Sequence, residues 1–325
     1  MSLEFIIVQS LIFIVPLLIV ALAGMYSERS GIINIALEGL MVVGAFSGVL
    51  FIHFMQKTPF FMNHPQILLI LALIVAAVSG LLFSLLLAFL AINMKADQTI
   101  GGTAINLLAA AMVLFLMKWI IKDTLISFTP NFQLKSQFLK PLGFINTIFF
   151  DQIYITTYLG IVILIATWFI FKYTKFGLRL SSCGEYPQAA QAAGIKVLRY
   201  RYFGVMISGV LAGVGGLIYV ITSSVSYTGT VSGYGFLALA VLIFGQWKPI
   251  KVLLASIVFG LFKTLSVIYF GVGFIAYLME AMPNVPIAMF FRMAPYIVTM
   301  IVLAITSKKS RAPKAAGIPF DQGKR

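Results

Sequence analysis

Asn34 and Glu38 are polar side chains able to do chemistry in an otherwise apolar stretch near the start of this chain. They are four residues apart, so on one continuous helix they would share a face. A carboxylate inside an apolar helix is costly and normally faces protein or water rather than lipid. Two interpretations stay open: the pair holds a kinked helix by hydrogen bonds, or it lines a path for a polar solute.

A second polar group follows Lys95. Asp97 precedes Gln98 and Thr99, a pattern that predicts the capped start of a helix. Gln98, Thr99 and Asn106 bring amides and a hydroxyl to the opening turns of that helix. Such neutral groups suit an uncharged solute better than an ion, although they also join helices. The predicted path therefore includes Asn34, Glu38, Gln98, Thr99 and Asn106.

Motifs of enzymes and metal sites are missing from the sequence. One cysteine, Cys183, excludes an internal disulfide and a multi-cysteine cluster, and two histidines give little support to zinc or haem. Neither a phosphate-binding G-x-x-x-x-G-K-[ST] loop nor a hydrolase G-x-S-x-G or H-E-x-x-H motif occurs. We expect no catalytic residues, no metal and no cofactor, so energy would come from another subunit or from an ion gradient.

The composition is that of a membrane protein. The chain is 61% hydrophobic and 10% charged, with a mean hydropathy of +1.04, and several runs reach the ~20 apolar residues that cross a bilayer. Residues 1–24 lack a basic start and a cleavage site, so they predict a retained span rather than a signal peptide. We predict an all-α, multi-pass fold of about 9 (8–10) spans. The candidate spans are 5–24, 32–54, 66–93, 98–120, 152–171, 203–222, 232–247, 252–271 and 291–307, with a partial span at 274–290. The run 66–93 is longer than one crossing requires, so we expect it to tilt or to bend at Ser79–Gly80.

Basic residues orient these spans. Six Lys and Arg lie from Lys172 to Arg201 and six more in residues 308–325, whereas none precedes Arg29. Cytoplasmic loops of membrane proteins carry such an excess, so the net charge of +14 reports topology and no nucleic-acid partner is expected. The prediction is a transmembrane domain at 1–310, containing a cytoplasmic loop at 174–200, and a basic cytoplasmic tail at 311–325. The aromatic-rich segment 121–151 would then lie outside, either against the membrane surface or as a docking surface for an external protein.

The loop at 174–200 carries a short, polar, alanine-rich helix. Glu185 would start it, where a negative charge is favourable, and Gly194 would end it. Small alanine side chains permit close docking of another protein, so the loop reads as a handle for a cytoplasmic partner, with an ordinary amphipathic loop helix as the alternative. Residues 204–216, rich in glycine, predict close helix packing.

Four stretches carry a family resemblance: residues 27–39, 96–109, 176–197 and 235–249. The sequence resembles the inner-membrane permeases of ATP-binding cassette (ABC) importers for branched-chain amino acids, ribose-type sugars and nucleosides, and among them the purine nucleoside permeases. The resemblance implies a bacterial cell membrane, a separate ATPase subunit, a second homologous permease and an extracytoplasmic substrate-binding lipoprotein. It also implies a coupling helix that docks on the ATPase, although Cys183 and Tyr186 depart from the family pattern. The coupling residues it implies are Gly184, Glu185, Pro187, Ala189, Ala190, Ala193 and Gly194.

The prediction is therefore a permease subunit that carries nucleosides inward, powered by ATP hydrolysis in another chain. A ribose-type sugar permease is the alternative within the same machinery. An ion-coupled secondary transporter is the alternative from another class, and it would need a titratable path through Glu38 and Glu280.

Overall fold

The fold is a bundle of long helices with two small two-stranded sheets. The computed structural model describes residues 3–129, 132–135, 151–269, 277, 287–306 and 312–321. Its helices are α1 (Leu3–Arg29), α2 (Leu37–Met55), α3 (Pro59–Asn63), α4 (Pro65–Ala88), α5 (Gln98–Ile120), α7 (Ile155–Tyr173), α8 (Lys175–Glu185), α9 (Pro187–Ala192), α10 (Val197–Ser223), α11 (Tyr234–Phe244), α12 (Pro249–Ile268) and α14 (Ile287–Thr306). Strand β1 (Ile126–Ser127) pairs antiparallel with β4 (Ser226–Tyr227), and β2 (Gln133–Lys135) pairs antiparallel with β3 (Asp151–Tyr154).

The predicted all-α, multi-pass architecture is confirmed. Within the described ranges, seven helices are long and apolar enough to cross a membrane: α1, α2, α4 with its extension, α5, α7, α10 and α12. The predicted span 291–307 corresponds to α14, and most of the partial span 274–290 lies outside the described residues. The predicted span 232–247 is shorter than expected, because α11 has 11 residues and at ~1.5 Å per residue reaches only about half of a ~30 Å hydrocarbon core.

Helix α10 is the centre of the bundle. It packs along α4, α1 and α2, and its glycines allow the close approach predicted for residues 204–216. A Cβ added to Gly44 of α2 would lie 2.2 Å from the Cα of Gly213, and one added to Gly80 of α4 would lie 2.3 Å from the oxygen of Gly209. Only backbone fits between these helices, so the small residues determine how they cross.

Helix α4 is longer than one crossing requires. The predicted bend at Ser79–Gly80 does not interrupt α4, which is α-helical through these residues. The departure from regular hydrogen bonding comes later, in a π-helical turn at Phe89–Asn93, where the wider turn ends the helix before α5 begins.

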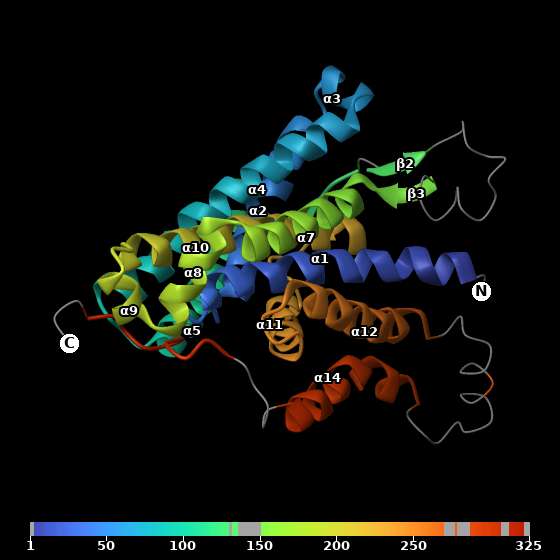
Figure 1. Cartoon of the computed structure of the whole chain (residues 1–325). Helices are drawn as coiled ribbons and strands as arrows, with labels where there is room; N and C mark the ends of the chain where they lie inside the picture. The colour runs from blue at the N-terminus through green and yellow to red at the C-terminus, as the bar shows by residue number, and fades with distance from the viewer. Residues whose placement is uncertain are drawn as a thin grey trace.

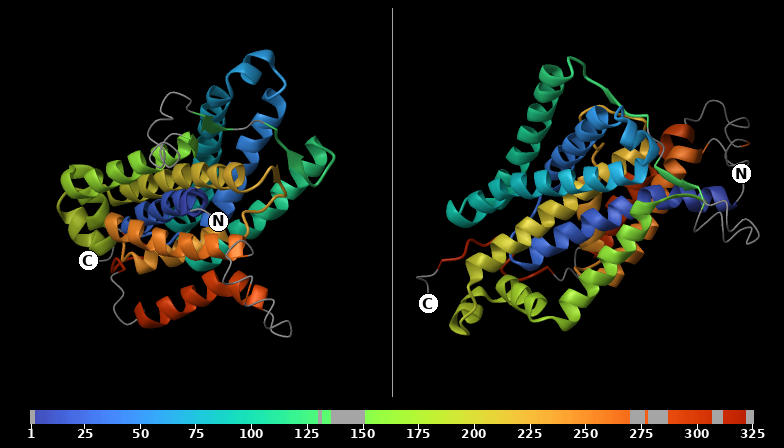
Figure 2. Two further views of the ribbon diagram at one scale, coloured as in Figure 1. Left: turned by 90° about the vertical axis from the view of Figure 1, so that its right-hand side faces the viewer. Right: turned by 90° about the horizontal axis from the view of Figure 1, so that it is seen from above.

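The two ends of the bundle differ (Figure 1). Helices α8 and α9 and the C-terminal segment lie together at one end, whereas α3, the β2–β3 hairpin and the start of α1 lie at the other. Of the aromatic residues in segment 121–151, Phe128 and Phe132 are buried in the core, and residues 136–150 lie outside the described part. Helices α5 and α14 occupy the periphery (Figure 2).

Candidate functional site: the α1–α2 junction and the coupling helices

The chain leaves the helical conformation between α1 and α2. We call residues 30–36 the junction. Gly31 has φ +96, a conformation that favours glycine, and the Ser27 hydroxyl donates to the Ile32 carbonyl at 2.8 Å. The polar run after the first span therefore forms a tight, self-bonded turn. The expectation that Asn34 and Glu38 share one helical face is wrong, because Asn34 lies in the junction and Glu38 lies in the first turn of α2.

Glu38 binds the start of α11. Its two carboxylate oxygens accept hydrogen bonds from the backbone N–H groups of Gly233, at 2.8 Å, and of Gly235, at 2.6 Å. The first N–H groups of a helix lack partners within the helix and carry partial positive charge, so a carboxylate is a favourable ligand there. Arg29, at the end of α1, donates to the Trp247 carbonyl at 2.9 Å.

The other end of α11 is held by α1. The Trp247 indole Nε1–H donates to the Glu28 carboxylate at 2.6 Å, and Glu28 is 7% exposed. Gln246 and Trp247 both have positive φ, at 51 and 53, an uncommon conformation for such residues. Neither Glu28 nor Trp247 was predicted as a site residue, although both lie in stretches that carry the family resemblance. Short helix α11 is thus fastened at both ends to residues that flank the junction.

Three amides complete the contacts of the junction. Asn34 is fully buried, and its Nδ2 donates to the Ser208 hydroxyl at 2.8 Å. The Gln98 Oε1 accepts from the Ile33 N–H at 2.8 Å. Asn106 accepts from the Gly39 N–H at 2.7 Å and donates to the Ile35 carbonyl at 2.9 Å. Gln98 and Asn106 thus satisfy backbone groups where the helix is broken, and Asn34 joins the junction to α10.

The start of α5 matches the expected cap. The Asp97 carboxylate accepts from the backbone N–H groups of Thr99 and Ile100 at 2.8 and 2.9 Å. Thr99 itself is exposed, whereas Gln98 is 4% exposed. Asn34, Glu38, Gln98 and Asn106 therefore gather around the junction, and Thr99 does not join them. Their role in a solute path stays a prediction.

The handle at 174–200 consists of two helices. Helix α8 is capped by the Thr174 hydroxyl, which accepts from the Gly177 N–H at 3.1 Å, and α9 follows a break at Tyr186. Glu185 therefore ends α8 and does not begin the alanine-rich helix. Pro187 explains the break, because proline disfavours a helical residue before it and is well tolerated at the first position of a helix.

Gly194 ends α9 as predicted. It has φ +80, and its N–H donates to the Gln191 carbonyl while the Ile195 N–H donates to the Ala190 carbonyl. This pair of bonds is the Schellman motif. Ala189, Ala193 and Gly194 are exposed, whereas Pro187 and Ala190 are buried. The outer face of α9 is thus free of large side chains at these positions.

Gly184 joins the handle to the junction. A Cβ on Gly184 would lie 2.4 Å from the Arg29 carbonyl oxygen and 3.1 Å from the Gly31 nitrogen. The end of α8 therefore rests directly on the backbone of the α1–α2 turn, with no room for a side chain between them.

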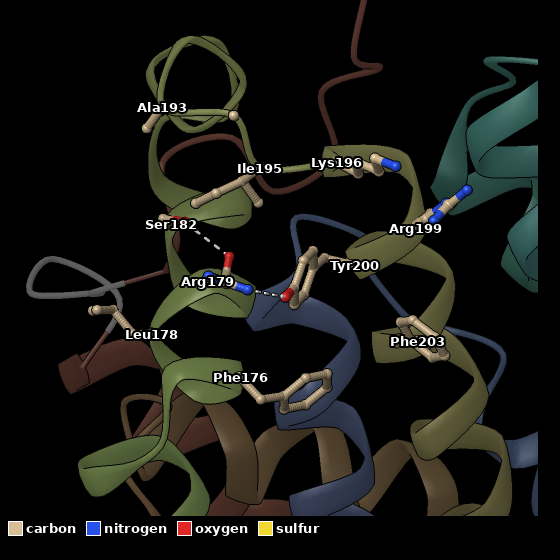
Figure 3. Close-up of a pocket in the computed structure, with 11 residues that line it drawn as sticks. Phe176, Leu178, Arg179, Ser182, Ala193, Ile195, Lys196, Arg199, Tyr200 and Phe203 are labelled. Carbon is tan, nitrogen blue, oxygen red and sulfur yellow. Dashed lines mark hydrogen bonds between the residues drawn. The ribbon is translucent and has the colours of Figure 1, made fainter.

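A groove of about 660 Å³ runs beside the handle. Figure 3 shows that its walls come from α8, from the turn after α9 and from the first turns of α10. The Arg179 Nη1 donates to the Tyr200 hydroxyl at 3.3 Å across it. Three cations, three aromatic rings and no carboxylate line the groove. The lining residues are Phe176, Leu178, Arg179, Ser182, Ala193, Gly194, Ile195, Lys196, Arg199, Tyr200 and Phe203.

Comparison with known proteins assigns the chain to a family. The family model "Branched-chain amino acid transport system / permease component" matches residues 6–305. The chain is 42% identical to the guanosine ABC transporter permease protein NupQ of Bacillus subtilis, over 99% of this chain and 98% of that protein. It is 39% identical to the nucleoside ABC transporter permease protein NupC of Lactococcus lactis, over the same shares. It is also 26% identical to a second Bacillus subtilis permease, the guanosine ABC transporter permease protein NupP, over 76% of this chain and 69% of that protein.

Both the family match and the full-length similarity extend over the junction, α11 and the handle. This chain belongs to the family of branched-chain amino acid transport system permease components, and it is a multi-pass membrane protein.

Proposed function

We propose that this chain is the membrane-spanning subunit of an ATP-driven importer of nucleosides, with purine nucleosides as the preferred solute. The observation that carries the proposal is the 42% identity, over nearly the full length, to a guanosine permease. A nucleoside is neutral at pH 7, and Asn34, Gln98 and Asn106, which gather around the junction, are likewise neutral hydrogen-bonding side chains. The same observation favours a nucleoside over a ribose-type sugar.

ATP hydrolysis belongs to a partner ATPase subunit in this proposal, so this chain is not an enzyme and holds no cofactor. The ATPase docks on α8 and α9, where Ala189, Ala193 and Gly194 leave room for a close approach. The basic groove beside them suits an acidic rim on the partner. The end of the bundle that carries the handle and the C-terminal segment then faces the cytoplasm of a bacterial cell.

Movement of the ATPase reaches the bundle through Gly184. Because Gly184 rests on the junction and the junction residues and their neighbours hold both ends of α11, a shift of α8 is transmitted to α11 without a flexible link. We propose that Asn34, Glu38, Gln98 and Asn106 shape the inner half of the solute path by holding this arrangement. Thr99 contributes only through the start of α5.

A second, homologous permease and an extracytoplasmic binding lipoprotein complete the proposed machine. The similarity to both NupQ and NupP, which come from one organism, supports a pair of different permeases. Helix α5 offers a peripheral apolar surface for such a partner, since Leu107 and Trp119 are 74% and 70% exposed. The lipoprotein would deliver solute at the opposite end, near the β2–β3 hairpin.

Uptake in proteoliposomes tests the proposal. The purified permease pair, its ATPase and its binding protein are reconstituted, and the uptake of labelled guanosine, uridine, ribose and leucine is measured with ATP inside. We expect ATP-dependent uptake of guanosine, unlabelled adenosine as a strong competitor, and neither ribose nor leucine uptake. Preferential uptake of ribose would replace the nucleoside by a sugar, and uptake without ATP would remove the importer altogether.

A further inference from the structure

Part of the predicted basic tail, residues 313–321, packs against the helix bundle. Residues 313–321, which we call the C-terminal segment, run beside α8 and α9 (Figure 1). Ala315 and Phe320 are 7% and 5% exposed, fractions typical of core residues rather than of a solvated tail. The sequence predicts only a basic cytoplasmic tail here, because four of residues 311–325 are Lys or Arg.

Three hydrogen bonds to backbone groups of this segment hold it against α8, the junction and α10. The Ala315 N–H donates to the Gly184 carbonyl of α8 at 2.8 Å, and the Gly317 N–H donates to the Gly31 carbonyl of the junction at 3.2 Å. The Ile318 carbonyl accepts from the Arg201 Nη1 of α10 at 3.1 Å. The first two acceptors are the residues where α8 rests on the junction, so the segment crosses the seam between them.

The buried Arg201 side chain binds the C-terminal segment. Its side chain is 1% exposed, and its Nε and Nη2 have no hydrogen-bond partner among the described residues. A buried cation needs acceptors, and the C-terminal segment supplies the Ile318 carbonyl. The Phe320 ring adds to this, with its centroid 5.7 Å from the guanidinium carbon.

Phe320 also covers the unique cysteine. It packs in a small apolar cluster with Cys183, Ala190 and Val197, which joins α8, α9 and α10. Two charged contacts lie at the ends of the segment: Lys314 Nζ donates to the Tyr186 hydroxyl, and Lys95 Nζ lies 3.3 Å from Asp321. The Lys95–Asp321 pair is half exposed and contributes little. The backbone bonds and the Phe320 ring therefore carry most of the attachment.

We propose that the C-terminal segment, residues 313–321, is a strap that keeps α8 seated on the α1–α2 junction and thereby positions the handle for coupling. The strap shares its bonding partners with the contact that transmits movement, so its release lets α8 move without the junction. The coupling consequence rests on the proposed function, whereas the position of the strap does not.

The rate at which Cys183 reacts with a thiol reagent measures whether the strap is in place. It is fully buried, it is the single cysteine of the chain, and burial raises the pKa of its thiol to about 11 from an ordinary value of 9.0. The thiolate is the reactive form, so a maleimide reacts slowly with the intact protein. Release of the strap exposes the thiol and returns its pKa toward the ordinary value, and two pKa units correspond to about 100-fold more thiolate near neutral pH.

The test compares three variants in the assembled complex: a chain ending after residue 310, Phe320→Ala, and Ile318→Ala as the matched control. The Ile318 side chain is 57% exposed, and its backbone carbonyl is kept in the control. We expect maleimide modification of Cys183 to accelerate by on the order of 100-fold in the shortened chain, to accelerate less in Phe320→Ala, and to stay unchanged in Ile318→Ala. Solute-stimulated ATP hydrolysis should fall most in the shortened chain, less in Phe320→Ala and not at all in Ile318→Ala. The ATPase should still co-purify with each variant.

Each arm of the test can overturn a different statement. An unchanged modification rate in the shortened chain means that the segment does not cover α8, and the strap is wrong whatever the protein transports. Fast modification with full ATPase stimulation means that the segment covers α8 but does not position it. If the unaltered complex shows no solute-stimulated hydrolysis, the proposed function fails, and the modification rates still decide the position of the strap.

Discussion

At the scale of single residues, Glu38 and Asn106 direct their hydrogen bonds at backbone groups of other elements. Glu38 accepts from Gly233 and Gly235, and Asn106 bonds both sides of the Ile35–Gly39 segment. Such bonds matter chiefly through the cost of breaking them, because a buried donor left without a partner costs about 1–3 kcal/mol. The effect of a substitution should therefore follow the number of partners it leaves unpaired.

Substitutions of Glu38 test whether the loss follows the number of hydrogen-bond donors left unpaired. Glu38→Gln keeps one acceptor oxygen and turns an N–H group toward the second donor, whereas Glu38→Leu leaves both donors without a partner. We expect transport to fall partially in Glu38→Gln and almost completely in Glu38→Leu, with a difference of about 1–3 kcal/mol between them. The measurement is the initial rate of guanosine uptake at matched membrane expression. Equal and near-complete losses would mean that the charge itself is essential.

Substitutions of tryptophan test the second fastening of α11. Trp247→Phe removes the indole N–H and leaves the buried Glu28 carboxylate without that donor, so we expect a loss of about 1–3 kcal/mol in stability and a lower thermal unfolding temperature in detergent. Trp119→Phe is the matched control, because Trp119 is 70% exposed. A lowered unfolding temperature in the control alone would place the important indole elsewhere.

At the scale of elements, the handle meets the junction through backbone contact rather than through charge. Helix α8 ends at Glu185 and meets the junction at Gly184, where no side chain fits. Helix α9 ends in a glycine whose added Cβ would meet no atom within 4 Å. The two glycines therefore serve different purposes: Gly184 provides space, and Gly194 provides a left-handed backbone conformation.

Matched glycine substitutions separate these purposes. Gly184→Ala puts a Cβ 2.4 Å from the Arg29 oxygen and must push α8 away from the junction, at a cost of about 1–3 kcal/mol. We expect solute-stimulated ATP hydrolysis to fall about tenfold with membrane insertion intact. Gly194→Asn should retain coupling, since asparagine adopts positive φ readily. Retained coupling in Gly184→Ala would mean that force reaches the bundle by another contact.

At the scale of the whole molecule, the two ends of the bundle carry different elements, and in the proposed function one end couples to the ATPase while the other receives the solute. The handle and the C-terminal segment lie at one end, and α3 and the β2–β3 hairpin lie at the other (Figure 1). Helix α11 crosses only part of the bundle and is held by Glu38 at one end and by Glu28 and Arg29 near the other. A short helix of this kind, fixed to the element that the handle touches, is suited to move as one body with the handle.

The energy source is a property of the whole assembly. If a separate ATPase drives α8, guanosine uptake by cells should continue when a protonophore collapses the proton gradient and ATP is maintained, and it should stop when ATP is depleted. The reverse pattern would favour the ion-coupled transporter, with Glu38 as the proton carrier. The second candidate carboxylate for that mechanism, Glu280, lies outside the described residues.

The sequence by itself determined the membrane class, the multi-pass helical fold, the family, the cap at Asp97 and the end of α9 at Gly194. These features depend on composition and on residues a few positions apart, and the amino-acid sequence contains both kinds of information. Only the tertiary structure decided that Glu38 binds Gly233, 195 residues along the chain, and that Glu28 binds Trp247. It also decided that Gly184 rests on Arg29 and that the charged tail is a packed segment. Such contacts depend on which helices cross and where. The conformational preferences of neighbouring residues do not specify which distant residue tertiary packing brings within hydrogen-bonding distance.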